Sequence, residues 1–238
     1  MAAVLGVHGR TMRRRPTPTG GAPRRRTSPA GWASAGLFFG LVAGLTLAIR
    51  AHELPLGFFA ASSEKIAAGE IWLLPASALV VDRPVYVGLV AFGLLGFTAL
   101  RICGTRLFWV VAVAGHIGST LAVYAIIAAS RLSDPDVFPG VVARPDFGVS
   151  AMQGAWVGAI AATGWGRAGA DPRSRGLVAA AVCALAAVAW LLHPDPSILT
   201  TEHLFAFLIG CCVVFWPRMA TSARTAIDTG LGAQPNAR

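Results

Sequence analysis

The stretch Pro145–Gly154, PDFGVSAMQG, joins a polar loop to a long apolar run, and the rest of the chain is arranged around it. Asp146 and Gly148 lie at the mouth of this run, and Ser150 lies just inside it. A serine at the start of a membrane helix is either a cap or packing residue, or a nucleophile at the wet edge of the bilayer. The nucleophile requires a second polar group at the same depth on another helix, and His203 in TEHLFAFLIG is the candidate.

The composition indicates a membrane protein. Of the 238 residues, 55% are hydrophobic and 13% are charged, and the mean hydropathy is +0.63. The charged share is about half of the ~25% that is typical of soluble domains. Little sequence lies outside the apolar runs, so we expect one membrane domain at residues 32–216, between a basic tail at 1–31 and a polar tail at 217–238.

Six apolar stretches predict an all-α polytopic membrane helix bundle, since several approach the ~20 residues that span a bilayer. They are Trp32–Ile49, Pro84–Leu100, Leu107–Ala129, Phe147–Trp165, Gly176–Leu192 and Ser197–Trp216. No signal-peptide cleavage pattern follows the first, which we expect to be a retained anchor. Asp195 and Pro196 are typical of a helix start, and Pro217 is expected to end the last helix. The apolar run Ile71–Val81 is too short to span and predicts an interfacial or re-entrant segment.

The charge distribution predicts that both ends of the chain lie in the cytoplasm. With six spans, 15 of the 20 Lys and Arg residues fall on the side of the termini, and nine of the 11 acidic residues fall on the other side. Basic residues in short loops stay in the cytoplasm, which gives an N-in, C-in protein of the cell membrane. No internal repeat is visible, and this disfavours a transporter built from inverted halves.

The N-terminal tail is strongly basic, with seven arginines and no acid before residue 30. Such a segment is predicted to be disordered and to contact anionic lipid. Nucleic-acid binding is not expected, because no aromatic or fold motif supports it. Met12 is an alternative start. The four cysteines lack metal-site spacing and are expected to pack, and no metal or cofactor is predicted.

Ser150 and His203 are predicted to reach the same depth on neighbouring helices. They lie roughly 6 Å and 9 Å into their helices at ~1.5 Å per residue. Small residues line both helices and favour close approach: Ala151, Gly154, Ala155, Gly158 and Ala159 on one, Ala206 and Gly210 on the other. A serine and a histidine in contact are the minimum for nucleophilic catalysis.

Three further polar groups stand near this pair. Asp146 is expected either to orient a partner or to cap the fourth helix, and Glu202 to serve the dipole of the first turn of its helix. His116 lies near the midpoint of the third span, with Ser119 and Thr120 on its face. We interpret it as a neutral histidine bonded to a neighbouring helix, with proton handling or substrate contact as the alternative.

The motifs around Ser150 and His203 resemble those of the rhomboid family of intramembrane serine proteases, and especially the divergent rhomboid-like proteins of actinobacteria. Gly148-Val149-Ser150-Ala151 is similar to the family's G-x-S-G motif, and His203–Gly210, HLFAFLIG, to its H-x2-G/A-x3-G helix. Residues 69–74, GEIWLL, resemble the approach to the family's membrane-embedded first loop. The resemblance covers roughly residues 32–216.

The resemblance implies a rhomboid-like six-helix fold with Ser150 as nucleophile and His203 as general base. Gly148 and Ala151 would form the oxyanion turn, with Asp146 and His116 as polar support. The substrates would be membrane segments of other proteins, cut near the outer face.

The chain departs from the family pattern at three places. Ala151 replaces a glycine, Leu73 follows Trp72 where the family has arginine, and residues 84–88, PVYVG, lack the histidine and asparagine that help hold the oxyanion. Losing one oxyanion donor costs ~100–1000-fold in rate. Three functions therefore stay open: an active protease, an inactive rhomboid-like protein that binds transmembrane segments, and a small transporter that uses His116 and Asp146.

Overall fold

The computed structural model describes residues 27–51, 54–82, 84–138, 140–169, 171–178, 181 and 198–231, with side chains in the last stretch described for residues 200–216. These residues are all-helical apart from loops and one isolated bridge between Ala61 and Asp146. The elements are α1 (Pro29–Arg50), the 3-10 turn η1 (Leu56–Phe58), α2 (Ser63–Ala67), α3 (Leu73–Ser77), α4 (Val85–Cys103), α5 (Thr105–Ser133), α6 (Val149–Ala168) and α8 (Ile198–Leu231).

Three of these helices, α1, α4 and α5, are long and apolar enough to cross a membrane. In α8 the stretch Thr200–Trp216 forms a shorter apolar segment. The prediction of an all-helical chain with helices long and apolar enough to cross a membrane is therefore confirmed for the described residues. Most of the expected fifth span, the helix start at Asp195 and most of the basic tail lie outside the described residues.

The helices begin and end close to the predicted positions, with one clear exception. The prediction that Pro217 ends the last helix is wrong, because α8 continues through Pro217 to Leu231. A proline inside a helix removes one backbone hydrogen bond and strains the preceding turn. Despite that penalty, the residues after Pro217 continue the helix.

Residues 54–82 form short helices in place of a span. The hydroxyl of Ser62 caps α2 by accepting a hydrogen bond from Lys65 N–H at 3.2 Å. The large side chains of Phe58, Ile71 and Trp72 are 60%, 66% and 49% exposed. The predicted interfacial or re-entrant segment Ile71–Val81 therefore begins with exposed side chains, but Leu73, Leu74, Val80 and Val81 are buried in the protein. Its place relative to a membrane stays a prediction.

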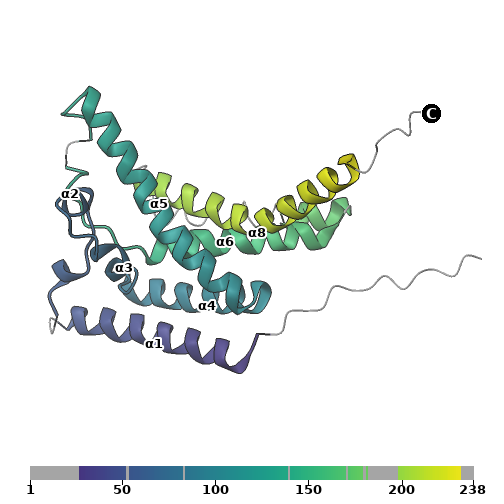
Figure 1. The fold of residues 1–238 in the computed structure, drawn as a ribbon. Coiled ribbons are helices and arrows are strands. Elements are labelled where there is room, and N and C mark those ends of the chain that lie inside the picture. Colours follow the sequence, from purple (N-terminus) through teal and green to yellow (C-terminus); the bar gives the residue numbers. More distant parts are fainter. Residues whose placement is uncertain are drawn as a thin grey trace, which may run out of the picture.

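The aromatic core gathers around Trp156 in the middle of α6. Its ring stacks on Phe108 of α5 at 4.8 Å and on Phe92 of α4 at 5.3 Å between centroids, and its Nε1–H donates to the Phe108 carbonyl at 3.2 Å. Figure 1 shows α6 and α8 side by side, α5 crossing at an angle, and α1 on the far side of α4. The core therefore holds α6 from several sides, and this places the turn before α6 inside the bundle.

Candidate functional site

The interface between α6 and α8 is the most extensive helix contact in the described part of the chain, and glycines make it possible. A Cβ on Gly158 would collide with the Phe207 carbonyl, and a Cβ on Gly210 would collide with the Ala155 carbonyl. Both obstacles are backbone atoms, which a rotamer change cannot move aside. The predicted close approach of these two helices through small residues is confirmed.

The same contacts give the register of the two helices. Gly154 lies level with His203 and Ala206, and Gly158 lies level with Phe207, so the two helices run in the same direction. Ser150 precedes Gly154 by one turn, about 6 Å along the axis. The backbone of His203 therefore lies about one turn deeper along this pair of helices than that of Ser150.

Ser150 lies in the first turn of α6 and is half-buried, as is His203 in α8. The Ser150 hydroxyl is 3.5 Å from the Phe147 carbonyl, at the long limit of a hydrogen bond. The N-cap of α6 is Gly148, with no side-chain cap, so neither Ser150 nor Asp146 caps this helix. The first backbone N–H groups, including that of Ala151, have no acceptor within the helix and are suited to bind an anion.

The turn at Gly148 is packed against His116 of α5. The imidazole occupies the space that a Cβ on Gly148 would need, and the Gly148 N–H donates to the Ser77 carbonyl at 3.1 Å. His116 Nε2 is 2.6 Å from the Leu74 carbonyl and 3.3 Å from the Ser77 hydroxyl. A carbonyl only accepts, so the proton is on Nε2. His116 thus joins α5 to α3, and its Nδ1 has no partner among the described residues.

Asp146 is buried beside α5 and not at the surface. The Tyr124 hydroxyl donates to its Oδ2 at 3.3 Å, and its backbone exchanges two hydrogen bonds with Ala61, at 2.8 and 3.1 Å. Its exposed fraction is 7%, and burial raises the pKa of the Asp146 carboxyl. The residue therefore holds the loop before α6 against two other parts of the chain.

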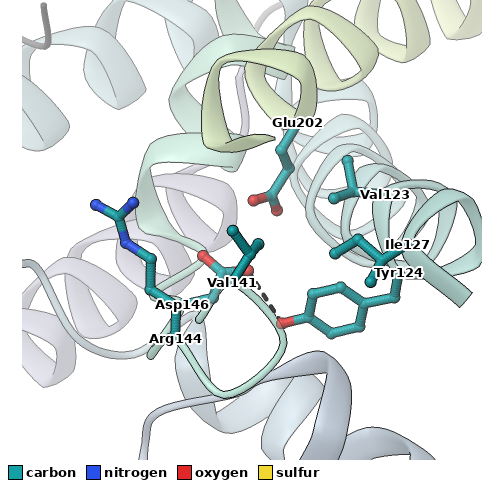
Figure 2. Close-up of a pocket in the computed structure, with 7 residues that line it drawn as sticks. All are labelled: Val123, Tyr124, Ile127, Val141, Arg144, Asp146 and Glu202. Atoms are coloured by element: carbon teal, nitrogen blue, oxygen red, sulfur yellow. Dashed lines mark hydrogen bonds between the residues drawn. The ribbon is translucent and has the colours of Figure 1, made fainter. Parts of the chain in front are cut away.

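Glu202 faces the bundle interior, so its assignment to the helix dipole was wrong. It is 3% exposed, and its Oε1 accepts a hydrogen bond from Thr120 Oγ1 at 2.7 Å. Its carboxyl group lies within hydrogen-bonding reach of that of Asp146. Figure 2 shows the two carboxyl groups and Tyr124 around a cavity of about 20 Å³, lined by Val123, Tyr124, Ile127, Val141, Arg144, Asp146 and Glu202.

The sequence interpretation missed Glu202 and Tyr124 as partners of Asp146. A signal for Glu202 was present, because an ionisable residue in an apolar helix is costly and normally faces the interior. Tyr124 carried no comparable signal, since a tyrosine near the end of a membrane helix is common at the interface. Within the described residues, no three His, Cys, Asp or Glu side chains gather as metal ligands would.

Comparison with known proteins found no matching family model, no matching curated protein and no matching solved structure.

Proposed function

We propose that this chain is a rhomboid-like intramembrane serine protease, with Ser150 as nucleophile and His203 as general base. The observation that supports this most is the register of α6 and α8. Gly154 lies against the backbone of His203, and Ser150 is one turn before Gly154 on the same helix. A hydroxyl and an imidazole near the same end of two touching helices are the minimum of a Ser–His dyad.

The chemistry follows from that pair. His203 takes the proton of the Ser150 hydroxyl as its oxygen attacks a peptide carbonyl, and the imidazolium then returns this proton to the leaving amine. Water attacks the acyl-enzyme in the second half of the reaction by the same proton transfers. The free N–H groups at the start of α6, with the Gly148 turn and Ala151, would hold the negative oxygen.

His116 and Asp146 act in this proposal as positioning residues. The His116 ring fills the space beside Gly148, and Asp146 holds the preceding loop through Tyr124 and Ala61. Both keep the first turn of α6 in place without touching the reacting atoms.

The proposed membrane arrangement has six spans with both termini in the cytoplasm. Three described helices are long and apolar enough to cross, and the proposal adds α6, the apolar run at 176–192 and α8. The excess of arginine on the side of the termini supports this orientation. The substrates are then transmembrane segments of other membrane proteins, cut near the outer face of the cell membrane.

Binding of transmembrane segments without cleavage is the second candidate. Two observations favour it: residues 84–88 lack the family's oxyanion pair, and the Nε2–H of His116 is directed to the Leu74 carbonyl. These positions therefore supply no side-chain donor to the oxyanion. In this case His203 and Ser150 pack the helix interface.

Labelling of the purified protein with a fluorophosphonate probe separates the two candidates. We expect labelling of the wild type that disappears in Ser150→Ala and His203→Ala and persists in Ser34→Ala, a matched change on α1. An active rhomboid protease serves as the positive control. A wild type that does not label under conditions where this control labels would favour binding without catalysis. Solute uptake by reconstituted vesicles would favour the transporter hypothesis instead.

A further inference from the structure

We propose that Asp146 and Glu202 share one proton and that this proton latches the loop at residues 140–148 onto the start of α8. The latch is closed while the proton is held and opens as the pH rises. It does not depend on the proposed protease activity, because it concerns only how three parts of the chain are held together.

The geometry joins three elements at one point. Asp146 belongs to the loop between α5 and α6, Glu202 to the first turns of α8, and the hydroxyl groups of Tyr124 and Thr120 to α5. Each hydroxyl donates to one carboxyl group, so a further donor is needed between the carboxyl groups themselves. A proton on one of them supplies that donor, because two ionised carboxylates can only accept.

The electrostatics favour a single shared proton. Two carboxylates in one buried site repel each other. Such a pair therefore keeps one proton at pH values where two isolated carboxyl groups would both be ionised. Asp146 and Glu202 are 7% and 3% exposed, and the cavity between them, about 20 Å³, has room for about one water molecule, so water screens the repulsion only weakly.

The charged neighbours leave this conclusion unchanged. Arg144 on the same loop lines the cavity and brings one positive charge, which balances a singly protonated pair but not a doubly ionised one. On α2, Lys65 Nζ donates hydrogen bonds to the carbonyls of Gly57 and Ala60. The backbone N–H of Glu64 donates to the Val142 carbonyl. His203 follows Glu202 on α8, and the remaining titratable group against the pair is the Tyr124 phenol.

Opening of the latch would move the segment that leads directly into α6. The loop continues from Asp146 to Gly148 within two residues, and α8 carries His203 immediately after Glu202. Loss of the proton would therefore loosen the first turns of α6 and α8 relative to one another. The aromatic core around Trp156 lies two turns deeper in α6 and would keep the rest of the bundle together.

Cysteine accessibility over pH tests the latch. Val141 is half-buried and lines the cavity, whereas Ala143 on the same loop is exposed. Val141→Cys and Ala143→Cys proteins in detergent are reacted with a maleimide between pH 5 and pH 9, and labelling at each position is quantified by peptide mass spectrometry. The ratio of the two rates cancels the intrinsic pH dependence of the thiol. We expect this ratio to rise by up to about tenfold per pH unit in the range where the pair loses its proton.

Two isosteric variants locate the titration. Glu202→Gln and Asp146→Asn each leave only one ionisable carboxyl group and supply N–H donors, so the ratio should change less than about twofold over the same range. A flat ratio with both wild-type carboxyl groups present would overturn the proposal. So would a rise that persists unchanged in both variants, because the titrating group would then lie elsewhere. If one variant fails to fold, the other locates the titration by itself, and fluorophosphonate labelling remains a separate readout of the protease hypothesis.

Discussion

The interface of α6 with α8 and the outer face of α1 carry the same small-residue spacing in opposite surroundings. On α6, Gly154 and Gly158 lie four residues apart and meet the backbone of α8. On α1, Gly36, Gly40 and Gly44 have the same spacing, yet no described atom outside the local backbone of α1 lies within 4 Å of where their Cβ atoms would be. The spacing of glycines thus predicts what a helix could accommodate and not what lies beside it.

The two surfaces also differ in the polar groups that accompany them. The α6 and α8 interface begins at a cluster of buried polar side chains, whereas α1 presents Leu37 and Leu41, 77% and 47% exposed, beside its glycines. Exposed leucines on a membrane helix are compatible with lipid. Close packing therefore coincides with the polar site, as expected where backbones must approach to bring short polar side chains together.

The largest expected effect comes from filling the close interface. Gly158→Leu should prevent stable folding, with a cost above the usual ~1–3 kcal/mol of overpacking, because the colliding atom is the Phe207 carbonyl. Thermal unfolding in detergent and size-exclusion chromatography measure the loss. Gly40→Leu on α1 is the matched control and should fold normally. An equal loss of Tm from both substitutions would show that the α6 and α8 interface is no more sensitive to added volume than the open face of α1.

Removing the buried carboxyl group at the top of the same interface should have the next largest effect. Glu202→Ala leaves the Thr120 hydroxyl without its acceptor and should cost about 1–3 kcal/mol of unfolding free energy. The apparent Tm in detergent measures it. Glu64→Ala, which removes an exposed acid on α2, should change the Tm little. A neutral outcome for Glu202→Ala would mean that the hydrogen bond contributes no net stability.

Stability should depend on pH through Asp146. Burial raises the pKa of its carboxyl in the folded state, so the native protein keeps a proton that the unfolded chain releases above pH ~4. This contribution is complete below that pH and is lost as the pH rises through the folded pKa, with a slope of up to ~1.4 kcal/mol per pH unit. Thermal unfolding at several pH values should show the decline in the wild type and a weaker one in Asp146→Asn. A stability that increases over this range would contradict the sign.

The smallest expected effect is on the open face of α1. Gly40→Ala adds a methyl group where no described residue lies and lowers the conformational entropy of the unfolded chain. A gain of roughly 0.5–1 kcal/mol is expected, visible as a small rise in Tm. Gly154→Ala is the matched substitution on α6. Its Cβ would lie 3.2 Å from the His203 carbonyl oxygen, and this tight contact should cancel the gain in unfolding free energy.

Several features were predictable because they depend on neighbours along the chain. The helices at α1, α4 and α6 follow from apolar runs bounded by polar or turn residues, and the turn between α4 and α5 follows from Gly104, whose φ of 81° suits glycine. The contact of α6 with α8 was predictable from small residues on both helices. His116 was correctly interpreted as bonded to another element, although its partner proved to be the short helix α3 and not a spanning one.

Other features were not predictable, because they depend on which elements meet. Glu202 points into the bundle only because α5 places Thr120 opposite it. Tyr124 and Asp146 are 22 residues apart, and only the path of the intervening loop brings them together. The continuation of α8 past Pro217 also escaped prediction, since one lost hydrogen bond did not outweigh the helical residues on both sides.

The amino-acid sequence alone predicts an all-helical chain with helices long and apolar enough to cross a membrane, because long apolar runs with few charges are stable in lipid as helices. It also marked Ser150 and His203 as polar residues near the starts of two such runs. The packing of the Gly148 turn on His116 and the meeting of Asp146 with Glu202 depend on how the helices come together in the folded chain. Those contacts join residues far apart in the chain, and their energies arise from burial and hydrogen bonding that no local pattern contains.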